Sequence, residues 1–197
     1  MRKSRVGVLI SGRGSNLMAL VKAARAPGYP AEIVCVVSNR DAAAGLEFAK
    51  ANGIAAMVIE HKTYASREAF EAALDAYLRS MKVEIIALAG FMRILTANFI
   101  SGWEGRMLNI HPSLLPAYRG QHTHERVLAD GVKVHGCSVH HVTAELDAGP
   151  VILQAEVPVL PGDTPDTLSA RVLKEEHRIY PLALALIAGQ LQAKTST

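Results

Sequence analysis

Residues 5–20 read RVGVLISGRGSNLMAL, and they join an apolar run, a glycine-rich loop and a helix-forming segment without a break. Val6–Ile10 is a β-branched, apolar run of strand length, and Leu17–Ala26 has helical character. Gly12 and Gly14 punctuate the loop between them. This succession predicts that the chain opens with a strand, a tight loop and a helix, as nucleotide-binding α/β folds do.

The same alternation continues to about residue 100. We expect further strands at Ile33–Val37, Ala56–Ile59 and Ile85–Ala89, and helices at Ala42–Ala51 and Ser66–Leu78. Apolar strands that alternate with helices are typical of a mostly parallel sheet that is covered on both faces.

The second half is less regular. Strands are expected at Arg106–Ile110, Gly136–Val142 and Val151–Val157, and helices at His122–Ala129 and Thr164–Ala188. Pro181 is expected either to kink the last helix or to start a new one. We find no repeat or linker, so the sequence predicts one α/β domain, Rossmann-like, with a mostly parallel twisted sheet and helices on both faces.

Composition limits the classes of function. The 197 residues are 50% hydrophobic, enough for one sizeable core, and their formal net charge is only +3. Acids and bases are interspersed, which suits small anionic substrates and does not by itself indicate nucleic acid. Cys35 and Cys137 lie far apart in apolar stretches, so we expect two buried thiols in a reducing cytosol. No stretch approaches the length of a membrane span, and the apolar run after the basic start is too short for a signal peptide, so we expect a cytoplasmic protein.

The loop SGRGSN at 11–16 carries the first chemical signal. Backbone N–H groups at the start of a helix bind anions, and glycines let a phosphate approach the backbone closely. The loop lacks the Gly-Lys-Ser/Thr ending of a Walker A sequence and the third glycine of GxGxxG, so a ribose phosphate fits it better than a dinucleotide. We expect a Cβ at Gly14 to crowd that phosphate. The alternative is a plain tight turn with Ser15 as the helix cap.

The segment NIHPSLLP at 109–116 carries the second. Asn109 and His111 are two residues apart, so on a strand they project to the same side. An amide donor beside an imidazole can polarise a carbonyl group and hold a developing oxyanion. Alternatively, both side chains only satisfy backbone groups at the end of the strand.

Asp147, in TAELDAGP at 143–150, is the candidate partner of His111. It lies in a predicted loop, where catalytic groups are common, and a nearby carboxylate favours the imidazolium and can help to relay protons. We expect it to act without a buried structural partner. The alternative is an Asx-type turn that closes a hairpin.

The eight histidines raise the question of a metal site. Those in question are the HxH pair His122 and His124, followed by His135, His140 and His141. No HExxH is present and no carboxylate or cysteine lies at ligand spacing among them, so we predict no metal. His140 should share a strand face with Ser138 and Val142 and line the cleft, whereas His141 should face the other way.

Four segments together resemble the folate-dependent formyltransferases. They are SGRGSN at 11–16, AGFMRIL at 89–95, NIHPSLLP at 109–116 and HVTAELDAGPVILQAEVPV at 141–159. The first two narrow the resemblance to the glycinamide ribonucleotide formyltransferases of purine biosynthesis, and it covers Val6 to about Gly189. The length favours this family over methionyl-tRNA formyltransferases, which add a C-terminal tRNA-binding domain, and over formyltetrahydrofolate deformylases, which add an N-terminal regulatory domain.

The resemblance implies an activity and a set of site residues. A formyl group would pass from 10-formyltetrahydrofolate, a co-substrate, to the amine of glycinamide ribonucleotide, without a metal or a tightly bound cofactor. The implied catalytic residues are Asn109, His111 and Asp147, and the implied ribonucleotide-binding residues are Gly14, Ser15, Asn16 and Glu176. The implied folate-binding residues are Arg67, Met92, Arg93, Ile94, Leu95, Asn109, Thr143, Ala144, Glu145, Leu146 and Asp147.

The expected organisation is a single formyltransferase domain over 1–197. About residues 1–100 would form the nucleotide- and phosphate-binding half, and about 101–197 the catalytic and folate-binding half. The expected partners are the two small substrates, without nucleic acid or membrane, and the choice between a monomer and a homodimer stays open. Ala117 and Arg119 stand where the family has a Lys-Tyr-Pro-Gly type of sequence, which leaves the shape of that loop open. The competing hypotheses are a deformylase, a nucleotide-binding module without activity, and a metal hydrolase.

Overall fold

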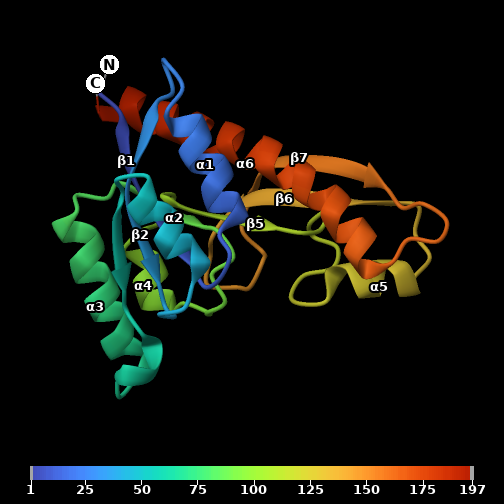
Figure 1. Cartoon of the computed structure of the whole chain (residues 1–197), viewed down its shortest axis with the longest axis horizontal. Helices are drawn as coiled ribbons and strands as arrows, with labels where there is room; N and C mark the ends of the chain where they lie inside the picture. The colour runs from blue at the N-terminus through green and yellow to red at the C-terminus, as the bar shows by residue number, and fades with distance from the viewer. Residues whose placement is uncertain (1, 196–197) are drawn as a thin grey trace.

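Seven strands form one sheet in the order β3-β2-β1-β4-β5-β6-β7 in the computed structural model, which describes residues 2–195 (Figure 1). The strands are β1 (Ser4–Ile10), β2 (Ala31–Ser38), β3 (Ala55–Val58), β4 (Ile85–Leu88), β5 (Met107–His111), β6 (Val134–His141) and β7 (Val151–Pro158). The first five strands are parallel, and β6 is antiparallel to both β5 and β7. The predicted mostly parallel α/β sheet is therefore confirmed.

Helices cover both faces of this sheet. They are α1 (Ser15–Ala24), α2 (Ala44–Ala51), α3 (Arg67–Ser80), α4 (Ala97–Ser101), α5 (Thr123–Ala129) and α6 (Pro165–Thr195), with a short 3-10 turn, η1, at His61–Thr63. Buried side chains of α1, α2, α5 and α6 share one core cluster, and those of α3 and α4 share the other. The long α6 crosses the sheet as one helix that continues through Pro181, so Pro181 does not start a new helix (Figure 1). The sequence did not predict α4, which has only five residues.

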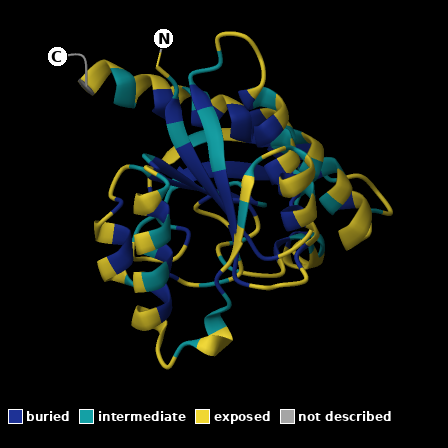
Figure 2. Ribbon diagram, turned by 60° about the vertical axis from the view of Figure 1, so that its left-hand side comes forward, coloured by how far each residue is buried: buried dark blue, intermediate teal, exposed yellow. Residues whose placement is uncertain are grey.

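The apolar alternation of β1 explains how one strand serves both cores. Val6, Val8 and Ile10 belong to the cluster under α1 and α6, whereas Leu9 belongs to the cluster under α3. Gly7 lies on the α3 side, where an added Cβ would come within 2.9 Å of Leu78 Cδ2. A side chain at Gly7 would therefore require Leu78 and its neighbours to shift. Figure 2 shows the result, a buried sheet between helices whose outer faces are exposed.

The strand order places two of the predicted functional segments side by side. The order reverses at β1, which has β2 on one side and β4 on the other, and ligands of open α/β sheets bind at such a point. The loop after β1 contacts the loop after β4, because the Ser11 N–H donates to Gly90 O (3.1 Å). In addition, the Met92 N–H donates to Ser11 Oγ (2.8 Å). The SGRGSN and AGFMRIL segments thus form one surface.

Two further features concern the chain as a whole. Cys35 and Cys137 are buried free thiols, as predicted, and burial raises the pKa of each to about 12. Among the helices that the structure describes, none is both long and apolar enough to cross a membrane.

Candidate active site

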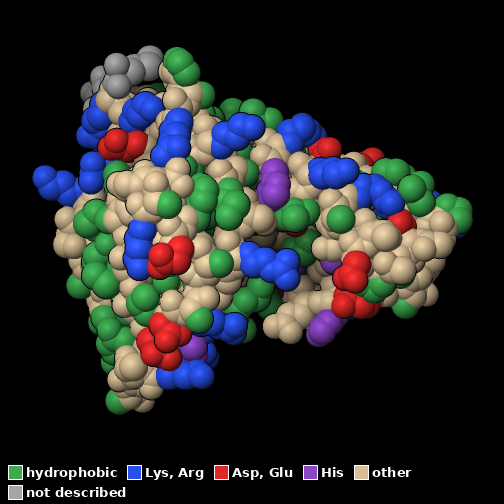
Figure 3. Space-filling view, in the orientation of Figure 1, with side chains coloured by type: hydrophobic (Ala, Val, Ile, Leu, Met, Phe, Trp, Pro, Cys, Tyr) green, Lys and Arg blue, Asp and Glu red, His purple; other side chains and the backbone are tan. Residues whose placement is uncertain are grey.

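A cavity of about 630 Å³ opens at the carboxyl ends of β4 and β5. Its lining comes from four segments, within residues 88–95, 109–112, 120–125 and 140–147, and from Ile100 of α4. The space-filling view shows the molecule hollowed in its middle, with basic, acidic and histidine side chains at the edge of the recess (Figure 3). Three of the four sequence motifs therefore contribute to the wall of one cavity.

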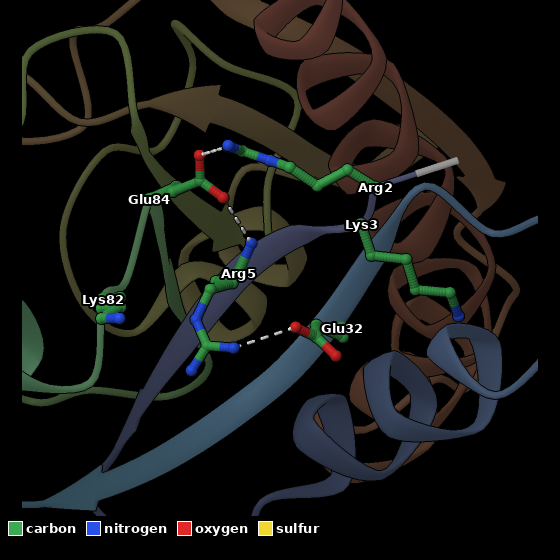
Figure 4. Close-up of a pocket in the computed structure, with 6 residues that line it drawn as sticks. All are labelled: Arg2, Lys3, Arg5, Glu32, Lys82 and Glu84. Atoms are coloured by element: carbon green, nitrogen blue, oxygen red, sulfur yellow. Dashed lines mark hydrogen bonds and ion pairs between the residues drawn. The ribbon is translucent and has the colours of Figure 1, made fainter.

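A second hollow, of about 490 Å³, lies among charged side chains at the amino ends of β1 and β2 (Figure 4). Its lining residues are Arg2, Lys3, Arg5, Glu32, Lys82 and Glu84. Both acids are already paired: Glu84 with Arg2 and with the Arg5 N–H, and Glu32 with the Arg5 guanidinium. Since parallel sheets bind ligands at the carboxyl ends of their strands, the first cavity is the candidate active site.

Asn109, His111 and Asp147 meet in that cavity. Asn109 and His111 project from the same face of β5, and the His111 Nδ1 atom lies 3.5 Å from Asp147 Oδ2. The other ring nitrogen, Nε2, lies 3.0 Å from the carbonyl oxygen of Tyr118. Because a carbonyl oxygen can only accept, Nε2 carries a hydrogen, and Nδ1 is the nitrogen left to face a substrate.

The surroundings of Asp147 differ from two of the sequence-based expectations. Its backbone has a φ of 49°, its side chain is buried, and Oδ2 accepts a hydrogen bond from the Gly120 N–H at 2.9 Å. The expectation that Asp147 needs no buried structural partner is therefore wrong. The hydrogen bond to Gly120, 27 residues earlier, also differs from a local Asx turn. The loop after Pro116 folds back over β5, which brings the Gly120 N–H to the carboxylate.

His140 lines the same cavity, as the strand pattern predicts. It is directly opposite Asn109 in the β5–β6 register, and its Nε2 lies 3.2 Å from Asn109 Nδ2. Burial is the main cause that lowers the pKa of His140; the hydrogen bond to the His141 carbonyl and the charge of Asp147 act in the opposite direction. A buried neutral imidazole therefore lies beside the amide of Asn109.

The chain that leaves β5 is held by Ser138, which lies opposite His111. Its buried hydroxyl donates to Ser113 O (2.6 Å) and accepts from the Leu115 N–H (3.0 Å). Sequence reasoning did not identify this role, nor those of the Tyr118 carbonyl and the Gly120 N–H. Backbone groups leave no signature in residue type, whereas a serine between two apolar residues on a buried strand was a usable signal.

Two of the predicted ribonucleotide residues meet across the molecule. Asn16 Nδ2 donates to Glu176 Oε2 at 2.7 Å, which connects α1 to α6. Among the described residues, the buried Asn16 Oδ1 has no hydrogen-bond partner. Burial raises the pKa of Glu176, and the hydrogen bond from Asn16 acts in the opposite direction.

Gly14 is the residue that starts α1, with a left-handed backbone (φ 76°) and no side-chain cap. Ser15 is therefore not the helix cap. A Cβ at Gly14 would lie 3.2 Å from Gly45 Cα and 3.4 Å from Leu17 Cδ2. A side chain at Gly14 would therefore be tight within the protein itself, and the expectation that it would also crowd a bound phosphate stays a prediction. The uncapped start leaves the first N–H groups of α1 available to an anion.

Most of the predicted folate residues line the cavity. Met92 and Ile94 are exposed (65% and 59%), whereas Leu95 is buried in the core cluster that includes α3. The cavity also has Arg93, Asn109, Thr143, Ala144, Leu146 and Asp147 in its wall. Arg67, at the start of α3, and Glu145, which is paired with Arg119 at 2.7 Å, are not among its lining residues.

Two of the remaining histidines, His124 and His135, contact each other. His124 Nδ1 and His135 Nε2 are 3.1 Å apart, and burial lowers the pKa of His135 to about 4 and also lowers that of His124. His122 lies outside this pair, with Nδ1 3.6 Å from Glu125. Within residues 2–195, no group of three or more His, Cys, Asp or Glu side chains is placed to hold a metal ion.

Comparisons with known proteins agree with this geometry. The sequence profile of the formyl transferase family matches residues 4–184. Phosphoribosylglycinamide formyltransferase of Escherichia coli is 49% identical over 94% of this chain and 88% of its own length. The crystal structure of phosphoribosylglycinamide formyltransferase from Brucella melitensis is 56% identical, with a TM-score of 0.92 over 95% of this chain and 96% of that one.

A longer relative matches over a part of its length. The trifunctional purine biosynthetic protein adenosine-3 of Bos taurus is 54% identical over 95% of this chain. The chain spans 19% of the length of that relative.

Proposed function

Because the chain belongs to the formyl transferase family, we propose that it transfers the formyl group of 10-formyltetrahydrofolate to the amine of glycinamide ribonucleotide. The products are formylglycinamide ribonucleotide and tetrahydrofolate, in purine biosynthesis. The observation that carries this proposal is the meeting of Asn109, His111 and Asp147 in one cavity with the largely apolar segment 91–95. The names of the relatives that match most of this chain support the choice of substrates.

The reaction follows from what each side chain can donate. The substrate amine attacks the formyl carbon, and the tetrahedral intermediate carries negative charge on the former formyl oxygen. The Asn109 Nδ2–H and the His111 Nδ1–H are the donors for that oxygen, since Nε2 of His111 is already bonded to the Tyr118 carbonyl. The gap of 3.5 Å between His111 Nδ1 and Asp147 Oδ2 exceeds a hydrogen bond, so Nδ1–H is not committed to the carboxylate.

The proton balance is completed within the site. As the amine becomes an amide, it loses one proton, and the leaving N10 atom of the folate gains one. Asp147 helps to move this proton from the amine to N10, and its negative charge stabilises the protonated His111 that donates to the oxyanion. No covalent intermediate with the protein and no redox step are required.

We assign the two substrates to opposite ends of the surface that the loops after β1 and β4 form. We place the phosphate of the ribonucleotide on the uncapped start of α1, with Gly14, Ser15 and Asn16, and its sugar near Glu176. We place the pteridine ring of the folate against Met92–Leu95 and the loop 143–147, where exposed apolar side chains border the cavity. The folate is a co-substrate, and Arg67 and Glu145 stay in the proposed folate set only through the family resemblance.

The proposal includes a division of labour within the domain. Residues 1–100 would serve mainly the nucleotide and residues 101–197 mainly catalysis and folate binding. The two halves overlap, because the proposed folate residues Arg67 and Met92–Leu95 belong to the first half and Glu176 of the second contacts Asn16. We also place the reaction in the cytoplasm, and the two buried free thiols support a reducing compartment.

The test is a folate-difference absorbance assay on the purified protein, with glycinamide ribonucleotide present or absent. We expect release of tetrahydrofolate only when the ribonucleotide is present. Equal release in its absence would mean that water accepts the formyl group, as in a deformylase, and would overturn the proposal.

A further inference from the structure

His140 lies directly opposite Asn109 in the antiparallel β5–β6 register, so the two side chains project from the same face of the sheet. Its residue exposure is 2%, and each ring nitrogen has one close polar neighbour. Nδ1 lies 2.9 Å from the carbonyl oxygen of His141, and Nε2 lies 3.2 Å from Nδ2 of Asn109.

These two neighbours determine where the single proton of the neutral ring resides. A carbonyl oxygen cannot donate, so the hydrogen between His140 and His141 belongs to Nδ1. The Nε2 atom of a neutral ring then carries a lone pair and needs a donor. Asn109 can supply that donor only through its Nδ2–H, which fixes which end of the amide faces His140.

We propose that His140 is a positioning residue that fixes the orientation of the Asn109 amide, so that an N–H and not the carbonyl oxygen is presented to the formyl oxygen. One hydrogen of Nδ2 is used by His140, and the second stays free for the oxyanion. An amide turned by 180° would offer its own oxygen lone pairs to the developing negative charge, which is repulsive. This inference rests on the proposed formyl transfer.

Gly149 packs against the His141 carbonyl, to which His140 Nδ1 is hydrogen-bonded. A Cβ at Gly149 would lie 1.8 Å from the oxygen of His141 and 2.8 Å from its carbonyl carbon. The neighbouring Pro150 carbonyl accepts from the His141 N–H at 2.9 Å. The peptide that sets the His140 tautomer is therefore packed directly against the backbone at Gly149, and any side chain at 149 would displace it.

Asp147 offers His140 an alternative hydrogen-bond partner in place of Asn109. Its Oδ1 lies 3.7 Å from His140 Nε2, so a ring with a proton on Nε2 would turn to the carboxylate and leave Asn109 without its acceptor. The two arrangements differ in the position of one proton, which can be observed directly.

The first measurement is the tautomer. Nitrogen-15 NMR of the histidine-labelled protein at neutral pH should show His140 as the neutral ring with its proton on Nδ1. A proton on Nε2, or an imidazolium, would overturn the assignment. This readout does not depend on the identity of the substrates, so it stays informative if the formyl-transfer proposal fails.

The second measurement is a pair of variants assayed for formyl transfer. His140→Leu removes the acceptor, and we expect kcat to fall by about 10²–10³-fold, the usual loss for one oxyanion donor, with the KM of both substrates within about threefold. His140→Gln can place Oε1 near the former Nε2 and should recover at least tenfold of that loss. Equal kcat in the two variants, or a loss confined to KM, would contradict the positioning role.

The control is His177→Leu, which removes a part-buried imidazole of α6. The Nε2 atom of His177 has no hydrogen-bond partner among the described residues. We expect kcat and KM to stay within about twofold of the wild type. A loss in this variant as large as that in His140→Leu would show that removing any buried ring is sufficient, and would remove the specific role of His140.

Discussion

Asp147→Asn separates the proposed catalytic role of the carboxylate from its structural one, because asparagine keeps the shape and loses the charge. Asparagine tolerates the left-handed backbone at this position, where φ is 49°. Its side-chain oxygen can accept the Gly120 N–H as Oδ2 does now, at 2.9 Å. What the substitution removes is the negative charge 3.5 Å from His111 Nδ1.

The expected change in stability is small. A hydrogen bond to a charged group contributes about 1.5–3 kcal/mol and one between neutral groups about 0.5–1.5 kcal/mol, so the bond to Gly120 weakens by about 1 kcal/mol. The neutral amide costs less to bury than the carboxylate, which offsets part of that loss. We expect the free energy of unfolding, measured in urea, to change by about 1 kcal/mol or less.

The expected change in turnover is much larger. A positioned acid–base group contributes about 10²–10⁴-fold to a rate, which corresponds to about 2.7–5.4 kcal/mol of barrier. Without the carboxylate, a protonated His111 loses its counter-charge during proton transfer. We expect kcat to fall within that range while the KM of each substrate changes little.

The assay is the folate-difference absorbance change at saturating ribonucleotide, and Asp166→Asn is the matched control. Asp166 lies exposed in the first turn of α6, so the same substitution there should leave kcat and stability near their wild-type values. Near-normal turnover in Asp147→Asn would refute the reasoning and would leave Asp147 as a structural link to Gly120. A loss of stability as large as the loss in barrier would refute it as well.

Three further outcomes are expected. Gly14→Val forces a side chain into a left-handed backbone and to within 3.2 Å of Gly45 Cα. We therefore expect the free energy of unfolding in urea to fall by about 1–2 kcal/mol and the KM for the ribonucleotide to rise. An unchanged KM for the ribonucleotide, or an equal rise in the KM for folate, would count against the phosphate site. The pKa of His135 is lowered from 6.5 to about 4 in the folded protein, so the unfolded chain binds the proton first and stability falls as the pH drops through that interval, by roughly 3 kcal/mol. His135→Leu should flatten this part of the urea-measured pH dependence, and an unchanged slope would contradict the assignment. Formyl transfer should survive exhaustive chelation, and a loss that zinc restores would overturn the metal-free mechanism.

The parallel half of the fold could be predicted because its strands and longer helices have strong local signals. Val6–Ile10 and Ile85–Ala89 are apolar runs of strand length, and the structure has strands at Ser4–Ile10 and Ile85–Leu88. Their order in the sheet was not predicted, because local patterns do not specify which strands become neighbours. The short α4 was missed because five residues are too few to show a helical period.

The sequence predicted the side chains of the candidate site that lie in recognisable motifs, but not the backbone groups that hold them. The partners of His111 and Asp147 in the loop after Pro116 are the Tyr118 carbonyl and the Gly120 N–H, and every residue except proline has both groups. Tyr118 has a positive φ of 54°, which is uncommon for a non-glycine residue and has no signal in the sequence. The pairing of Asn109 with His140, 31 residues apart, depends on the β5–β6 register, which local pattern does not specify.

The spacing within LDAGP has a physical explanation in this arrangement. Asp147 directs its carboxylate to His111, and two residues later Gly149 packs onto the His141 peptide that holds His140 against Asn109. One loop therefore supports both functional side chains of β5, the first through charge and the second through close backbone packing. The proposed reaction requires the charge of the aspartate, and the backbone packing requires the glycine because a Cβ would lie 1.8 Å from a carbonyl oxygen. Gly149→Ala should consequently displace the side chain of Asn109 more than that of Asp147, although position 149 is closer to Asp147 along the chain.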